Sequence, residues 1–310
     1  MQHYLKETNI VDFSDLTVMQ LAKDLAKDCK NDEEVAKNCF LYVRDEIQYS
    51  GDIQANITTC KASDVLKYKT GWCYAKAILL AALLRANNIP TAFCYQRLSC
   101  SEYEDGVYCL HGLNAIYLKE SGWYRVDARG NKEGVDAQFI PPKEKLAFEL
   151  QENEYDLPHF YSEPLDVVIK ALQTYKNYDE MVQNFPDIRE YKSTFCEVSY
   201  LVEKNAIFCQ WKQQCSDKEY REPLEYALEL TTTTQATLWI TDTTNGFENN
   251  PKDTQWLMEV FIPQTIQSSI KKVIFLIQND SSLKKEIENQ AEALREFFDV
   301  ILVSDLENSI

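Results

Sequence analysis

The chain has 310 residues, 45% of them hydrophobic and 26% charged, which is typical of a globular protein with about two domains. Its 49 acidic residues outnumber 32 basic ones, giving a formal charge of −17 that disfavours nucleic acid and anionic membrane surfaces as partners. The first residues show no basic segment followed by an apolar one, and no apolar run approaches the roughly 18 residues of a membrane span. We therefore expect a cytoplasmic protein with neither nucleic-acid nor membrane partners.

Helices precede strands in the first part of the chain. Residues 14–46 predict two helices, the first capped by Ser14 or Asp15 and the second opened by Asn31 and a run of acids. Residues 71–85 are apolar on nearly every side, which predicts a buried helix. Alternating patterns then predict three strands, at 91–98, 108–118 and 122–128. This order is typical of an α+β fold, with a buried helix packed on an antiparallel sheet.

The pattern changes twice after residue 130. Residues 140–192 are acidic, aromatic and interrupted by prolines, and they predict one helix near 164–178. From about residue 194, strands and helices alternate, which indicates a separate α/β domain. The predicted strands are 195–202, 206–212, 236–240, 273–277 and 300–303, and the predicted helices are 218–230, 254–268 and 283–298. We place the boundary after residue 192, giving domains of residues 1–192 and 193–310.

The ten cysteines bear on both redox state and metal binding. Without a secretion signal, we expect reduced and mostly buried thiols rather than a disulfide framework. No pair has the Cys-x-x-Cys spacing, and only three histidines accompany them. We therefore predict no metal site and no cofactor, even though Cys94, Cys100 and Cys109 are close in sequence.

Cys73 is the cysteine best placed to react. It follows a glycine in the first turn of the predicted buried helix, where unpaired N–H groups and the helix dipole favour an anion. The same N–H groups can bind the oxyanion that forms when a thiolate attacks a carbonyl. The alternative interpretation is an inert, buried thiol, which is common among cytosolic cysteines.

A nucleophilic thiol needs a base, and His111 is the best candidate. His3 lies in the terminal segment and His159 in an acidic stretch flanked by proline. Asp127, at the end of the next strand, can orient the imidazole. If the intervening loop is centred on Glu120, then His111 and Asp127 are diagonal neighbours on one face of the sheet. A shift of one residue in register would separate them onto opposite faces.

Three segments resemble the motifs of the transglutaminase-like superfamily of papain-like cysteine enzymes: residues 71–75, 110–113 and 123–127. Their order and their placement on a helix and two strands are those of the family, and the similarity covers roughly residues 1–185. Residues 61–70 and 127–134 look like a bacterial branch of it. The resemblance implies a catalytic triad of Cys73, His111 and Asp127 acting through a thioester, with a peptide or amide as substrate. The same triad serves hydrolysis and acyl transfer to an amine or thiol, so the acyl acceptor stays open.

The chain departs from the family pattern at two glycines. Gly112 stands where many members have an aromatic residue, and Gly51 stands where a tryptophan often precedes the aspartate. We therefore assign no side chain of this loop to the oxyanion hole. Trp72 could shield the thiol from water, but a role in the core is favoured.

The last part of the chain has a second, weaker resemblance. Residues 220–230, 238–242 and 253–256 are similar to segments of STAS-like modules, which are small sheet-and-helix domains related to sulfate-transporter tails and anti-sigma-factor antagonists. The resemblance covers about residues 195–310 and implies docking to a protein partner or regulation. The threonines of residues 241–246 lack the usual Ser-Gly pair, and we expect a solvated loop there. The alternative function for the whole chain is a non-catalytic binding or regulatory module that keeps the cleft and docks through this domain.

Overall fold

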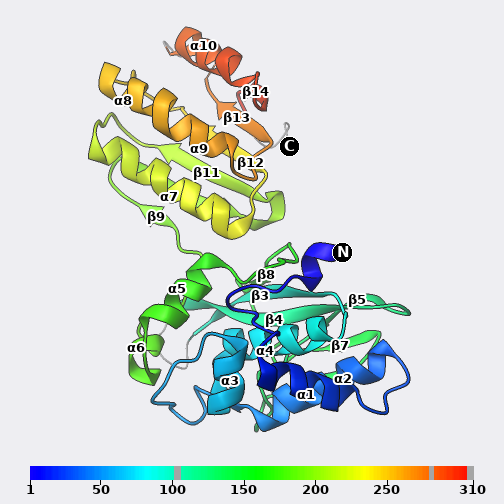
Figure 1. The fold of residues 1–310 in the computed structure, drawn as a ribbon. Helices are drawn as coiled ribbons and strands as arrows, with labels where there is room; N and C mark the ends of the chain where they lie inside the picture. The colour runs from blue at the N-terminus through cyan, green and yellow to red at the C-terminus, as the bar shows by residue number, and fades with distance from the viewer. Residues whose placement is uncertain (101–105, 279–282, 306–310) are drawn as a thin grey trace. The chain divides into compact units, whose positions relative to one another are not determined.

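The computed structural model describes residues 1–100, 106–278 and 283–305, and the chain divides into two compact units, Met1–Asp187 and Ile188–Ile310 (Figure 1). The sequence placed the boundary after residue 192 instead. The structure puts it earlier because β9 (Tyr191–Lys192) pairs with β10 (Cys196–Leu201) and so belongs to the sheet of the second unit. Within the described residues, no helix has the length and apolar character needed to cross a membrane.

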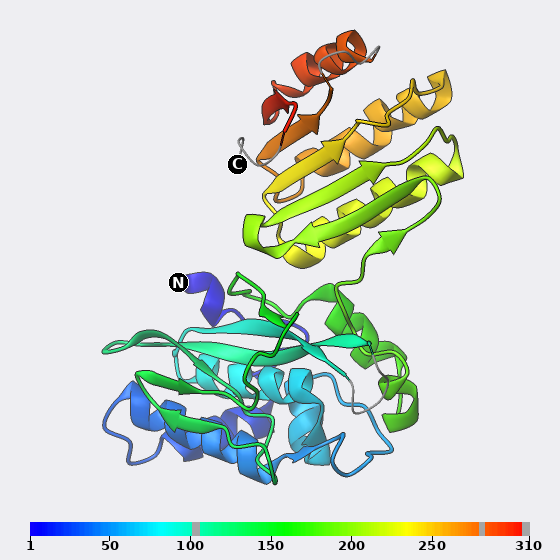
Figure 2. The same cartoon turned by 180° about the vertical axis from the view of Figure 1, so that it is seen from behind.

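Helices α1 to α4 of the first unit lie on one side of its main sheet, as Figures 1 and 2 show from opposite directions. Asp15 caps α1 by accepting from the N–H groups of Thr17 and Val18, and Asn31 caps α2. The two predicted helices are thus confirmed with their caps. The helical elements are η1 Gln2–Leu5, α1 Leu16–Ala26, α2 Asp32–Glu46, α3 Ala62–Tyr68, α4 Cys73–Ala86, α5 Asp166–Thr174 and α6 Tyr178–Val182.

The main sheet of the first unit is antiparallel with strand order β5-β4-β3-β8. Its strands are β3 Thr91–Ser99, β4 Tyr108–Leu118, β5 Gly122–Val126 and β8 Tyr155–Asp156. Two further pairs are β1 Gln48–Tyr49 with β2 Thr70–Gly71, and β6 Gln138–Ile140 with β7 Lys143–Lys145. Asn114 pairs with Val126 and Leu118 with Gly122, so the loop is centred on Glu120 and the predicted register is confirmed.

The buried helix α4 forms the centre of the first unit. Every residue from Cys73 to Arg85 is buried, and α4 packs against α1, α2, α3, β3 and β4. Each fully buried leucine of this helix contributes about 1.5–3 kcal/mol relative to an exposed one. Since α4 is enclosed on all sides, its first residue is held in a fixed position.

The second unit has a six-stranded sheet of order β14-β13-β12-β11-β10-β9, in which β11 to β14 are parallel and β9 to β11 antiparallel. Sequential parallel strands joined by right-handed crossovers place all helices on one face, as Figures 1 and 2 show. The predicted strand–helix alternation is confirmed. The remaining elements are η2 Val202–Lys204, β11 Ala206–Trp211, α7 Lys218–Thr234, β12 Leu238–Asp242, α8 Pro251–Trp256, the π-helical turn η3 Leu257–Phe261, α9 Ile262–Ile266, β13 Lys272–Leu276, α10 Lys284–Leu294 and β14 Asp299–Val303.

One cysteine pair differs from the expectation of free thiols. The structure joins Cys100, at the end of β3, to Cys109 of β4 in a disulfide, so the prediction of reduced thiols is wrong for these two. Pairing of β3 with β4 brings Leu98 opposite Cys109, which carries the two cysteines into proximity. The other eight cysteines, Cys73 among them, are free.

Candidate active site

The thiol of Cys73 lies at the first position of α4. Trp72 precedes it in extended conformation as the N-cap residue and its side chain makes no capping hydrogen bond. The first-turn N–H groups therefore stay available to an anion near the sulfur. The N–H of Gly112 on β4 also donates to Cys73 Sγ, with a nitrogen–sulfur distance of 3.5 Å. The partial positive charges of the α4 N-terminus and of the Gly112 N–H thus both face this sulfur.

Gly112 permits this close approach of β4 to the start of α4. A Cβ at this position would lie 2.9 Å from Cδ1 of Tyr74 and 3.3 Å from its Cα. The Tyr74 hydroxyl donates to the carbonyl of Leu110, which ties the helix to the strand. The departure from the family pattern at Gly112 therefore has a local steric reason, because Tyr74 occupies the space that a side chain would need.

His111 and Asp127 form a buried pair beside the thiol. His111 Nε2 lies 2.7 Å from Asp127 Oδ2, and the His111 ring also hydrogen-bonds Cys73. Because Nε2 faces the carboxylate, Nδ1 is the nitrogen left to face the sulfur. Asp127 directly follows β5, and the register of β4 and β5 puts it on the face that carries His111. The structure thus brings all three predicted residues together.

The electrostatics of this pair favour a charged imidazole. Burial by itself lowers the pKa of His111, but the charges of Asp127 and Cys73 and hydrogen bonds to both raise it to about 10. Burial raises the pKa of Asp127, and the charge and hydrogen bond of His111 outweigh this and lower it. The N–H groups of Arg129 and Ala147 also donate to this carboxylate, at 3.0 and 3.2 Å. His111 is therefore held as an imidazolium at neutral pH.

The triad is nearly closed to solvent. Cys73 and His111 are each 5% exposed, and the ring of Phe148 meets the His111 ring edge-on with 5.0 Å between centroids. Phe148 follows Ala147, whose N–H binds Asp127, so the segment that orients the carboxylate also covers the imidazole.

Trp72 belongs to the core, as the favoured interpretation predicted. It is 1% exposed and packs against Tyr49, Tyr178 and Phe185. Gly51 lies beneath this cluster, and a Cβ there would meet the Tyr49 ring at 2.6 Å and Trp72 at 3.2 Å. The loop therefore has no room for the tryptophan that relatives often carry at this place.

Arg129 is a further residue near the site, which the sequence did not single out. Its guanidinium binds both carboxylate oxygens of Asp52 at 2.8 Å and lies 4.0 Å from the centre of the Tyr49 ring. Burial raises the pKa of Asp52, but hydrogen bonds to Arg129 and Lys132 outweigh it and lower the pKa. Arg129 thereby ties residues 49–52 to the segment after Asp127. The sequence signal that could have identified Arg129 is its position two residues after Asp127.

No group of three or more His, Cys, Asp or Glu side chains in the described ranges is arranged to hold a metal ion. The other two histidines contact tyrosines. His3 packs against Tyr4 and His159 against Tyr161.

Comparison with known proteins finds one family that resembles part of the first unit. Residues 19–128 match the sequence model of the transglutaminase-like superfamily, a range that includes Cys73, His111 and Asp127. Residues 19–128 of the first unit are thus similar to a transglutaminase-like domain. No curated protein matches the sequence.

Solved structures are similar over part of the chain. A candidate cysteine protease from Cytophaga hutchinsonii is 19% identical over 41% of this chain and 40% of its own, with a TM-score of 0.33. The periplasmic domain of TgpA from Pseudomonas aeruginosa is 19% identical over 40% of this chain and 45% of its own, with a TM-score of 0.31. A candidate protease from Parabacteroides distasonis is 13% identical over 45% of this chain and 29% of its own, with a TM-score of 0.28. The chain spans less than half the length of each of these proteins.

Proposed function

We propose that this protein is a cysteine enzyme that transfers acyl groups through Cys73, His111 and Asp127, most simply by hydrolysing an amide or peptide bond. The observation that carries the proposal is the buried chain of contacts from the Cys73 thiol through the His111 ring to the Asp127 carboxylate, at an uncapped helix N-terminus. An inert thiol would need neither a charged imidazole nor its buried carboxylate, each of which is unfavourable to bury alone.

The proposed reaction has two halves. In the first, Cys73 Sγ attacks the carbonyl carbon and the oxyanion accepts hydrogen bonds from first-turn N–H groups of α4. The protonated His111 then gives its proton to the leaving amine as the carbon–nitrogen bond breaks, which leaves a thioester on Cys73. In the second half, neutral His111 takes a proton from the acceptor as it attacks the thioester. The thiolate leaves, and the imidazolium is restored.

Asp127 acts in this scheme by holding the imidazole. Its carboxylate fixes Nε2 as the protonated nitrogen on its own side and stabilises the imidazolium. The backbone N–H groups of Arg129 and Ala147 keep the carboxylate in place. Water is the simplest acceptor, and an amine or thiol would use the same groups.

For the second unit, the proposal is a STAS-like role in docking or regulation of a protein partner. The sequence resemblance and the mixed sheet with helices on one face support it. The second candidate function is a non-catalytic binding or regulatory module that keeps the cleft and docks a partner through the second unit. The low exposure of Cys73 and the cover by Phe148 favour it over an enzyme with a freely open site.

A trapped acyl-enzyme separates the two functions. The full chain is mixed with p-nitrophenyl acetate, quenched in acid and digested, and the acetylated cysteine is located by mass spectrometry. We expect acetylation at Cys73, none in His111→Ala, and a rate lowered by several orders of magnitude in Asp127→Asn. Cys29→Ser, which removes a partly exposed free thiol, is the matched control and should react like wild type. Equal acetylation of Cys73 in wild type and in His111→Ala would refute the proposed enzymatic function.

A further inference from the structure

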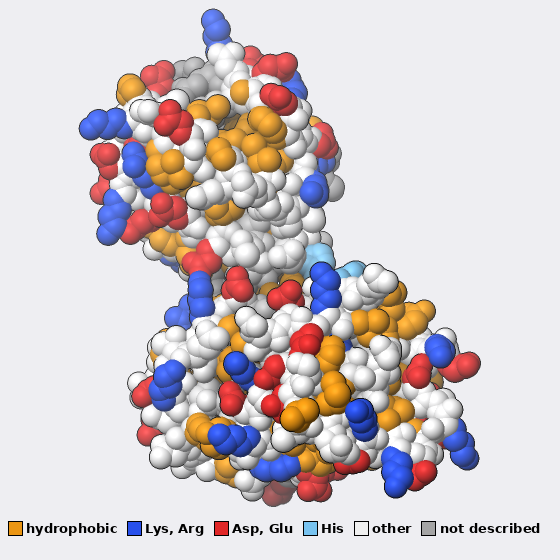
Figure 3. All heavy atoms as spheres, viewed as in Figure 1, with side chains coloured by type: hydrophobic (Ala, Val, Ile, Leu, Met, Phe, Trp, Pro, Cys, Tyr) orange, Lys and Arg blue, Asp and Glu red, His pale blue; other side chains and the backbone are white. Residues whose placement is uncertain are grey.

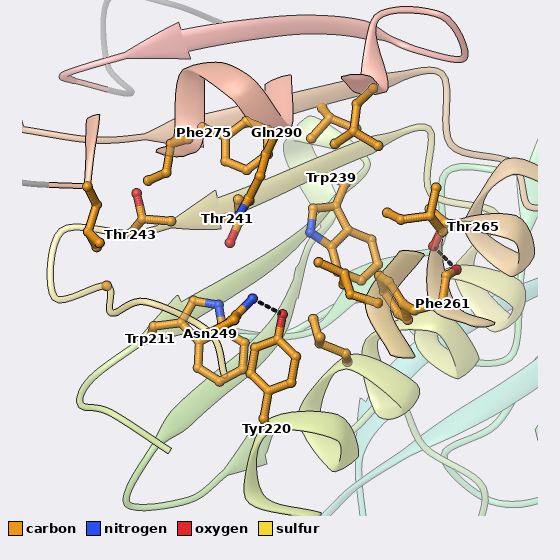
Figure 4. Close-up of a pocket in the computed structure, with 18 of the residues that line it drawn as sticks. Trp211, Tyr220, Trp239, Thr241, Thr243, Asn249, Phe261, Thr265, Phe275 and Gln290 are labelled. Carbon is orange, nitrogen blue, oxygen red and sulfur yellow. Dashed lines mark hydrogen bonds between the residues drawn. The ribbon is translucent and has the colours of Figure 1, made fainter. Parts of the chain in front are cut away.

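The second unit has a partly open cavity of about 120 Å³ between the helix-covered face of its sheet and the helices above it. Strands β11, β12 and β13 form the floor, while α7, η3, α9 and α10 supply the walls (Figure 4). Aromatic rings make up much of the lining, among them Trp211, Tyr220, Trp239 and Phe275. The Trp211 ring stacks on the Tyr220 ring with 5.2 Å between their centroids, so the two rings form a flat part of the cavity wall.

The lining carries no charge. None of the described residues around the cavity is Asp, Glu, Lys, Arg or His, although 26% of the chain is charged. A charged ligand would lose its hydration here without gaining a partner, which is strongly unfavourable. The cavity therefore selects an uncharged molecule.

Polar side chains also line this cavity, among them Thr241, Thr243, Asn249, Thr265 and Gln290 (Figure 4). The amide of Asn249 donates to the Tyr220 hydroxyl at 2.9 Å, and the Thr243 hydroxyl donates to the carbonyl of Leu276 at 2.8 Å. Thr241, in contrast, makes no hydrogen bond through its hydroxyl to any described residue, and it points into the space beside Asn249 (Figure 4). Thr241 and Thr243 of the predicted threonine loop both line the cavity and are half-exposed.

The helix above the cavity is locally widened. Between α8 and α9 it forms the π-helical turn Leu257–Phe261, followed by Pro263, whose missing N–H cannot continue the regular ladder. Such turns occur frequently at functional sites. The turn brings Phe261 against Trp239, with 5.6 Å between centroids. Hydrophobic side chains also gather on the surface of this unit that is seen in Figure 3. Met258 of the π-helical turn and Ile266 of α9 are exposed.

We propose that this cavity is a binding site for a small uncharged aromatic molecule with one ring and one hydroxyl group. An apolar cavity of roughly 150 Å³ accommodates one benzene ring, so the volume here suits a single ring. The aromatic walls receive the ring edge-on or offset-stacked. Thr241 supplies the hydrogen bond that the hydroxyl requires, and the absence of charge excludes anionic analogues.

The first test follows the indole N–H signals of the five tryptophans by NMR in the full chain. On titration with p-cresol, the signals of Trp211 and Trp239 should shift and saturate, while those of Trp72 and Trp123 in the first unit stay in place. The anion 4-hydroxybenzoate should leave all of them unchanged. No saturable shift with p-cresol, or equal shifts with 4-hydroxybenzoate, would overturn the proposal.

Substitutions then test the hydroxyl and the volume separately. Thr241→Val keeps the shape and removes the hydroxyl, so p-cresol should bind about 3 to 10 times more weakly, while toluene binds as before. Thr232→Val, on the exposed side of α7, is the matched control and should change neither affinity. Val273→Phe fills the cavity and should abolish binding of both ligands, with folding checked by circular dichroism. If Val273→Phe does not fold, Thr241→Val decides: equal effects on p-cresol and toluene, or none on either, contradict the site.

Discussion

Replacing Asp127 with asparagine should lower the pKa of His111. Burial favours the neutral imidazole, and the charges of Asp127 and Cys73 with their hydrogen bonds overcome it, raising the pKa from 6.5 to about 10. Asparagine has nearly the same shape but no charge, so it removes the larger of the two charge contributions. The imidazolium then loses its main support while its burial stays the same.

The magnitude follows from the size of this perturbation. A pKa about 3.5 above the ordinary value corresponds to about 5 kcal/mol of preference for the imidazolium. Asp127 and Cys73 both contribute to this preference, and one opposite charge close to an imidazole raises its pKa by about 1 to 3. We expect Asp127→Asn to lower the pKa of His111 by about that much. Since the folded pKa lies above the unfolded one, this interaction stabilises the fold fully below pH 6.5 and is lost as the pH rises toward 10.

The assay is an NMR titration of the imidazole carbon-bound protons. The chain has only three histidines, so His3 and His159 serve as internal controls in the same spectra. Cys73→Ser separates the contribution of the thiol from that of the carboxylate. The reasoning is refuted if His111 titrates near 6.5 in wild type, or if Asp127→Asn leaves its pKa unchanged.

Three further substitutions test the packing around the site. Gly112→Ala places a methyl group against the neighbouring tyrosine ring and should lower the free energy of urea unfolding by about 1–3 kcal/mol; an unchanged value would mean that β4 can shift away from α4. Burial lowers the pKa of Lys76 from 10.5 to about 7, so the free energy of unfolding should rise between pH 7 and 10.5. Lys76→Met should flatten this rise, and an unchanged pH dependence in urea melts would refute the account. Phe148→Ala removes the cover of His111 and should speed alkylation of Cys73 by iodoacetamide, whereas a slower reaction would show that the ring orients the site.

The sequence predicted those features of the fold that local pattern controls. Helix α4 follows from an unbroken apolar run, and its start follows from the glycine before Cys73. The hairpin register follows from alternation and a three-residue loop centred on Glu120, and these two signals are enough to place His111 and Asp127 on one face of the sheet.

The features that the sequence missed depend on distant contacts. Arg129 binds Asp52, which lies 77 positions earlier in the chain, and no local sequence pattern links the two residues. The steric reason for Gly112 lies in Tyr74, on another element. The boundary moved because β9 has only two residues, too few to produce a detectable alternation. The cavity of the second unit likewise arises from side chains of three strands and several helices.

Alkylation kinetics test the central claim most directly. Wild type and His111→Ala are treated with iodoacetamide at pH 7, and modification of each cysteine is followed by peptide mass spectrometry. The account predicts one fast-reacting thiol in wild type, Cys73, and loss of this fast phase in His111→Ala. A wild-type Cys73 that reacts as slowly as the other free cysteines, or equally fast with and without His111, would contradict it.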